Sequence, residues 1–88
     1  MDLELKPGAI KDMKELSDQA RKDIIKVLEE FEEKQFTHPG IKQIKDNDGK
    51  WIWRLKVKTD YTDHRVFIDY IDGCFQVLEV MHRDNAYE

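Results

Sequence analysis

Residues 50–58 alternate between apolar and mostly basic side chains, and this pattern constrains the fold more than any other feature of the sequence. Because successive side chains of a β-strand point to opposite faces of its sheet, the segment is predicted to be a strand. One face of that strand carries four large apolar residues, Trp51, Trp53, Leu55 and Val57. The other face carries Ile52 together with the cations Lys50, Arg54, Lys56 and Lys58. The first face has to pack against another apolar layer, and we expect Trp51 and Trp53 to be core residues.

Two more strands, over residues 65–71 and 74–81, are predicted on either side of Asp72-Gly73. This dipeptide is typical of a two-residue hairpin turn of the type I′ kind, which fixes the register of the strands that it joins. The predicted register pairs Ile71 with Cys74, Phe67 with Leu78, Arg65 with Val80 and Asp63 with His82. Strict alternation then places His82 on the face of Arg65 and Arg83 on the other, unless the chain bulges or turns after Met81.

The N-terminal half predicts one strand and two helices. Residues 2–6 alternate as a short strand, which Pro7-Gly8 ends. Helical spacing of apolar residues, with Ser17 and Asp18 as N-cap residues, divides the following segment into helices over about 8–16 and 18–35. Residues 41–49 and 59–63 are polar and turn-rich, so both segments are predicted to be loops.

The second helix carries an apolar stripe at spacing i, i+3, i+4 and i+7, formed by Ile24, Val27, Leu28 and Phe31. We expect this stripe to pack on Trp53, Leu55 and Val57. The predicted fold class is therefore α+β, in the order strand-helix-helix-strand-strand-strand, with a helical hairpin packed on one face of an antiparallel sheet. The 88 residues are expected to form one domain, 1–88.

Composition limits where the protein acts and what it binds. Cys74 is the only cysteine, so no internal disulfide forms, and no stretch approaches the ~20 apolar residues of a membrane span. Since the N-terminus also has no apolar leader, we expect a cytoplasmic protein without a membrane partner. The net charge of −4 opposes binding to nucleic acid, yet residues 50–58 hold four cations and no acid. A local basic patch can bind phosphate even on an acidic protein.

The basic face of residues 50–58 has two interpretations. Arg54, Lys56 and Lys58 stand at i, i+2 and i+4, which places their charges about 6–7 Å apart, close to the phosphate spacing of a single nucleic-acid strand. The same pattern is also typical of exposed strands, in which lysine opposes edge-to-edge aggregation. Both interpretations stay open on the pattern alone.

A second group of polar residues is predicted near one end of the basic face, namely Arg65, His82, Arg83 and Tyr87. These residue types suit a phosphodiester-cleaving site without a metal, in which one group deprotonates a 2′-OH and another protonates the leaving 5′-oxygen. Cations would stabilise the charge on the phosphorane. The histidines and the cysteine lack metal-ligand spacing, so we expect no metal and no cofactor.

Several motifs together resemble those of the RelE/ParE toxins. The family pattern is roughly G-x-W-R-L-R-V, Y-R-V-x-Y and V-L-x-V-x-H-R-x-x-x-Y, and it corresponds here to residues 49–57, 64–70 and 77–87. The resemblance implies a cytoplasmic toxin that a cognate antitoxin neutralises. It also implies, for the RelE branch, a protein that enters the ribosomal A site and cuts mRNA through 2′-OH attack, without a metal.

Carried over by position, the resemblance implies roles for individual residues. Arg54 and Lys56 match the basic pair of the first motif, and Lys58 extends that row. Arg65 matches the phosphate-stabilising arginine of the second motif, and Arg83 with Tyr87 matches the closing motif. His82 is an acid or a base in this scheme. The implied catalytic residues are Arg65, Arg83, Tyr87, Lys56 and His82, and the implied RNA-binding residues are Arg54, Lys56 and Lys58.

Two other functions stay open at this point. A ParE-like toxin would inhibit DNA gyrase by binding to it, without cutting RNA. A module that only binds a partner protein would use apolar residues exposed on the outer sheet face, such as Ile52, to accept an antitoxin helix. The acidic loop before Arg65 favours such a module, because Asp60 and Asp63 would screen or orient the nearby cations.

Overall fold

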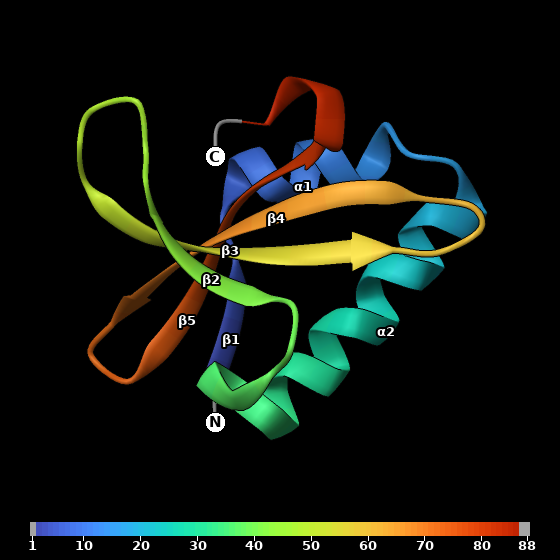
Figure 1. Ribbon diagram of the computed structural model, residues 1–88. Coiled ribbons are helices and arrows are strands. Elements are labelled where there is room, and N and C mark those ends of the chain that lie inside the picture. The colour runs from blue at the N-terminus through green and yellow to red at the C-terminus, as the bar shows by residue number, and fades with distance from the viewer. Residues whose placement is uncertain (1, 87–88) are drawn as a thin grey trace.

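The structure is a computed structural model and describes residues 2–86. Seven main elements follow one another along the chain: β1 (Asp2–Leu5), α1 (Pro7–Lys14), α2 (Asp18–Lys34), β2 (Ile41–Lys45), β3 (Trp51–Lys58), β4 (Asp63–Ile71) and β5 (Cys74–His82). Two short 3-10 turns, η1 (Gln35–Thr37) and η2 (Arg83–Asn85), follow α2 and β5. Figure 1 shows the strands as one twisted sheet, with both helices on the same face.

The five strands are arranged in the order β1-β5-β4-β3-β2. β1 runs parallel to β5, whereas the other neighbouring strands are antiparallel. The predicted α+β class, with a helical hairpin packed on one sheet face, is confirmed. The sheet is mixed, and not purely antiparallel as the prediction had it, because β1 at one edge runs parallel to β5.

The sequence prediction missed strand β2. Residues 41–45 were expected in a loop, but they pair antiparallel with β3 at the edge of the sheet. Their mostly polar side chains hide the strand, since an edge strand needs little apolar burial to be held by its backbone. The following turn closes the hairpin: the Asp46 carboxylate accepts hydrogen bonds from the backbone N–H groups of Asp48 and Lys50, both at 2.9 Å. Gly49 has φ 81°, a conformation that favours glycine.

The two helices are separated where the sequence predicted a break. The Ser17 hydroxyl accepts a hydrogen bond from the Ala20 N–H at 3.2 Å and caps α2. α1 ends at Lys14, two residues earlier than expected. The Arg21 side chain stabilises this turn, because it donates hydrogen bonds to the carbonyl oxygens of Met13 and Leu16 at 3.0 Å each.

The main core lies between the helices and the inner face of the sheet, as the apolar stripe of α2 predicts. Ile24, Leu28 and Phe31 are buried against Leu55 and Val57, while Val27 and Trp53 pack at the edge of the same cluster. Phe31 also meets Phe75 of β5 edge-to-face at 4.7 Å between ring centroids. Trp51, expected in this core, is 56% exposed instead, because β3 begins beyond the part of the sheet that the helices cover.

A second, smaller apolar cluster lies on the outer face of the sheet. Ile44, Ile52 and Phe67 are buried there, with Leu78, Met81 and Ala86 packed against them. The expectation that Ile52 is exposed is therefore wrong: its side chain is only 1% exposed. β2 and the segment after β5 supply the residues that cover it.

The pairing of β4 with β5 contains a β-bulge that the turn-based register did not anticipate. Ile71 lies opposite Cys74, as predicted, but Phe67 lies opposite Glu79. Leu78 is the extra residue of the bulge, since Ile68 pairs with Val77 on the other side of it.

Beyond the bulge, every pair differs by one residue from the predicted register. Arg65 lies opposite Met81, and His64 lies opposite His82. The predicted pairs Phe67–Leu78, Arg65–Val80 and Asp63–His82 are wrong. Because directly opposed residues share a face, His82 lies on the inner side of the sheet and not on the face of Arg65.

Candidate functional site

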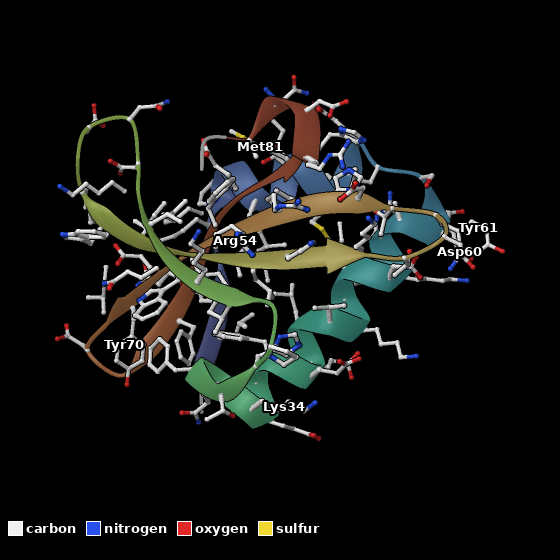
Figure 2. The ribbon with its side chains drawn as sticks, in the orientation of Figure 1. Lys34, Arg54, Asp60, Tyr61, Tyr70 and Met81 are labelled. Atoms are coloured by element: carbon white, nitrogen blue, oxygen red, sulfur yellow. The ribbon has the colours of Figure 1, made fainter. Side chains whose placement is uncertain are left out.

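The predicted basic row lies on the outer face of the sheet, opposite the helices. Leu55 and Val57 point into the main core, so the side chains between and beside them point the other way. Lys56 and Lys58 are exposed, and within residues 2–86 neither forms an ion pair. Arg54 is half-buried, and its Nη1 donates a hydrogen bond to the Gly40 carbonyl oxygen at 3.1 Å. The row therefore offers two exposed lysines and one arginine held close to the sheet, which Figure 2 labels.

Arg65 lies directly opposite Lys56 in the β3–β4 pair, on the same outer face. Only 6% of the residue is exposed. Its Nη1 donates hydrogen bonds to Asp63 Oδ1 at 3.0 Å and to the His64 carbonyl oxygen at 3.2 Å. The guanidinium is therefore a fixed charge under the surface rather than a mobile one.

Arg83 reaches the same carboxylate from the other end of the chain. The chain turns into η2 directly after β5, and Arg83 is its first residue. Its Nη1 lies 3.4 Å from Asp63 Oδ2, and its Nε lies 3.6 Å from Asp84 Oδ1. The turn after Met81, which the sequence required for Arg83 to join Arg65, is present.

Asp63 thus lies between the two arginines, one on each carboxylate oxygen. Lys58 is its direct partner across the β3–β4 pair. Burial opposes ionisation of this carboxyl, but the hydrogen bond from Arg65 and the charges of Arg83, Arg65 and Lys58 outweigh it, so the pKa of Asp63 is lowered. The carboxylate is charged and oriented at neutral pH. Asp60, the other acid of this loop, forms no ion pair within the described residues and lies at the exposed tip (Figure 2).

His82 borders this group from the inner side of the sheet. Its ring meets that of His64 edge-on, with the ring centroids 5.4 Å apart. Its Nδ1 accepts a hydrogen bond from the Asp84 N–H at 3.2 Å. The pKa of His64 is lowered, first by burial of the ring and then by the nearby His82, while Asp63 acts in the opposite direction.

The structure brings most of the predicted site residues to one end of the sheet. Lys56, Lys58, Arg65 and Arg83 share the outer face or its end, Arg54 stands further along β3, and His82 lies on the other side. Tyr87 lies outside the described residues. Sequence reasoning placed Asp63 near the site without foreseeing the bridge, and it overlooked His64. The spacing Asp63-x-Arg65 on one strand face was the available signal for the bridge.

Two other kinds of feature, a metal-ligand cluster and a membrane-spanning helix, are absent from the described residues. Among residues 2–86, no three His, Cys, Asp or Glu side chains are grouped in a way that could hold a metal ion. No described helix is long and apolar enough to span a membrane.

Comparison with known structures identifies the class of protein. The chain resembles one chain of the RelB–RelE antitoxin–toxin complex of Methanococcus jannaschii, with 19% identity, a TM-score of 0.64 and coverage of 91% of this chain and 89% of that one. It also resembles a chain of the RelE–RelB complex of Pyrococcus horikoshii OT3, with 13% identity, a TM-score of 0.67 and coverage of 97% of both chains. For a chain of the intact RelBE complex of E. coli, the identity is 20%, the TM-score is 0.64, and the coverage is 99% of this chain and 98% of that one. At these identities the likeness shows a shared RelE-like fold.

The family itself follows from the sequence. The model of the ParE toxin of type II toxin–antitoxin systems, parDE, matches residues 3–87. The chain therefore belongs to the ParE toxin family, and it is a type II toxin of the RelE/ParE kind. No curated protein matches the sequence.

Proposed function

We propose that this toxin inhibits translation as a ribosome-dependent, metal-independent mRNA endonuclease. The observation that carries the proposal is the convergence of Lys56, Lys58, Arg65 and Arg83 at one end of the outer sheet face. Two of these cations are exposed and two are held by Asp63. Such an arrangement suits a single phosphate group with its neighbours along one RNA strand.

The proposed reaction needs an attacking oxygen, a leaving oxygen and charge stabilisation. A base removes the proton of a 2′-OH, the freed oxygen attacks the adjacent phosphorus, and the 5′-oxygen leaves with a proton from an acid. The products are a 2′,3′-cyclic phosphate and a 5′-OH. In this scheme Arg65 and Arg83 neutralise the phosphorane, Lys56 contacts the same phosphate and Tyr87 supplies the proton. His82, on the inner side of the strand end, borders the site as a further acid or base.

We infer ribosome dependence from the resemblance to the RelE branch, and the charge of the protein agrees with it. A net charge of −4 disfavours the capture of free RNA, because most of the affinity for nucleic acid comes from phosphate neutralisation. Arg54, Lys56 and Lys58 form too small a basic row to overcome this alone. A ribosome that presents the mRNA strand supplies the positioning that the protein lacks. This requirement also places the toxin in the cytoplasm.

A cognate antitoxin is the second proposed partner. The three similar structures are complexes of a RelE with its RelB. In our proposal the antitoxin of this system blocks activity by covering the outer sheet face or by displacing the segment after β5.

A second candidate function is inhibition of DNA gyrase by binding, without catalysis. The match to the ParE model over residues 3–87 favours it. The pairing of both arginines with Asp63 also favours it, since a pure binding protein has no need of free cations.

Mapping of mRNA 5′ ends separates the two functions. Induction of the wild-type toxin should generate new 5′ ends within translated codons, and purified toxin should cut mRNA only when ribosomes are present. Arg65→Ala should lose both effects. Intact mRNA and continued translation, together with DNA damage and filamentation, would refute the nuclease and support the gyrase candidate.

A further inference from the structure

The carboxylate of Asp63 lies between Arg65 and Arg83, the two arginines that the proposed function assigns to an RNA phosphate. Oδ1 lies 3.0 Å from Arg65 Nη1, and Oδ2 lies 3.4 Å from Arg83 Nη1. A carboxylate is planar and a phosphate is tetrahedral, but both present oxygen acceptors that arginine can bind through paired N–H groups. The protein therefore holds a carboxylate of its own between these two arginines.

Burial makes this pairing more than a surface contact. The Asp63 side chain is 23% exposed, and the Arg65 side chain beneath it is 7% exposed. The Arg83 side chain is 53% exposed and closes the pair from the solvent side. A ligand that approaches from the outer face meets Arg83 and Asp63 before it meets Arg65. The Asp63 carboxylate therefore lies between an approaching ligand and Arg65.

We propose that Asp63 is an internal phosphate surrogate, which keeps Arg65 and Arg83 in phosphate-binding positions and is displaced when an RNA phosphodiester enters. The displaced carboxylate swings toward Lys58, its partner across the β3–β4 pair, and the phosphate takes its place between the arginines. No covalent bond changes in this exchange. The role rests on the proposed RNA substrate, and Asp63 is a positioning residue and not a catalytic one.

The electrostatics of the carboxylate favour this role over that of general base. Although partial burial opposes ionisation, the two arginines and Lys58 outweigh it, so the pKa of Asp63 is lowered. A carboxylate with a lowered pKa is a weak proton acceptor. The same cations make it a strong competitor for an incoming anion. The exchange also gives selectivity, because only a ligand that contacts both arginines at once replaces the two ion pairs that it breaks.

Asp63→Asn tests the exchange directly, with Asp60→Asn as the matched control. Both variants remove one negative charge from the same loop region, but Asp60 is exposed and forms no ion pair among the described residues. The probe is a short RNA oligonucleotide with 2′-deoxy substitution, which cannot be cut. Binding is followed by fluorescence anisotropy at low salt, because low salt strengthens the weak affinity of this protein for RNA outside the ribosome.

The proposal predicts that Asp63→Asn binds the oligonucleotide about tenfold more tightly than wild type, whereas Asp60→Asn changes affinity less than about threefold. Equal affinities for the two variants would overturn the proposal. A loss of cleavage by Asp63→Asn at unchanged affinity would instead make it a general base.

A measurement on the wild-type protein keeps the test independent of folding of the variant. Inorganic phosphate is titrated while the side-chain NMR signals of the Asp63 carboxyl and the Arg65 and Arg83 Nε–H groups are followed. The proposal predicts that phosphate shifts all three together and moves the carboxyl signal toward that of a solvent-exposed aspartate. Arginine shifts with an unchanged carboxyl signal would contradict it.

The outcomes also separate this inference from the proposed function. If wild-type toxin leaves mRNA intact on ribosomes but Asp63→Asn gains affinity, only the nuclease proposal fails. If wild type cuts mRNA but Asp63→Asn binds no better than Asp60→Asn, only the surrogate role fails.

Discussion

The two faces of the sheet are built from the same strands but do different work. The inner face is apolar throughout its helix-covered part, with Leu55 and Val57 of β3 buried against α2. The outer face combines a small apolar cluster with exposed lysines and a buried arginine. In β3, the fully buried Leu55 is followed directly by the exposed Lys56. The comparison indicates that packing on one face holds charges in place on the other, so substitutions on the two faces should separate stability from activity.

Leu55→Ala should have the largest effect on stability. Leu55 is fully buried in the main core, and the loss of a buried leucine costs about 2–5 kcal/mol. Urea denaturation should show this loss. Its neighbour Lys56 points to the outer face, and Lys56→Ala should change the unfolding free energy by less than about 0.5 kcal/mol. If both variants lost a similar amount of unfolding free energy, the inner and outer faces would contribute equally to stability.

Arg65→Ala should have the largest effect on activity. We expect ribosome-dependent cleavage to fall about 100- to 1000-fold, as for the loss of one preorganised group that stabilises a transition state. Toeprinting or primer extension on programmed ribosomes measures the rate. Arg65→Lys, which keeps the charge but not the paired N–H groups, should recover only part of it. Full activity of Arg65→Ala would exclude Arg65 from the site.

Removal of a helix cap should lower stability moderately and leave the cleavage activity of the outer face unchanged. Ser17→Ala removes the hydroxyl that accepts the Ala20 N–H at the start of α2, at a cost of about 1 kcal/mol. Gln19→Ala, also at an exposed position of this first turn, is the control and should change stability far less. If mRNA cleavage falls in Ser17→Ala under conditions where the protein stays folded, the faces are coupled more tightly than we infer.

The smallest predicted effect is a pH dependence that originates at the inner side of the site. Because the pKa of His64 is lowered in the folded protein, the unfolded chain binds the proton first. The stability from this group is full above the unfolded pKa of ~6.5 and is lost as pH falls from there toward the lower folded-state value. His64→Asn should flatten the change in Tm between pH 8 and 5. His38, whose pKa is also lowered by burial, stays in both proteins, so an identical slope would contradict the assignment to His64.

The sequence predicts those parts of the fold that a local pattern encodes. The alternation of β3 and the stripe of α2 each require one apolar face, so their pairing could be foreseen. Strand β2 could not, since Lys42 and Gln43 carry no apolar signal and the strand is held by its backbone partners in β3. Ile52 was misplaced for a related reason: it is buried by β2, which the sequence did not predict, and by the segment after β5, which is distant in the sequence.

The candidate site was predictable in composition but not in geometry. The residue types and the resemblance indicate Arg65 and Arg83 together. The bulge at Leu78, which moves His82 to the other face, has no Gly or Pro to mark it, and Leu78 packs in the outer cluster with Phe67. The spacing Asp63-x-Arg65 indicates only one of the two contacts of Asp63. The contact with Arg83 requires the turn into η2, which sequence spacing does not reveal.

One experiment tests the central claim, that the outer face carries the activity and the inner face the stability. Cleavage of mRNA on programmed ribosomes is measured for the double variant Lys56→Ala/Lys58→Ala and for Lys22→Ala/Lys26→Ala, which removes the same charge from exposed positions of α2. Both proteins should unfold at the wild-type Tm. The account predicts that the β3 variant loses cleavage while the α2 variant keeps it. Equal activity of the two variants would contradict the account.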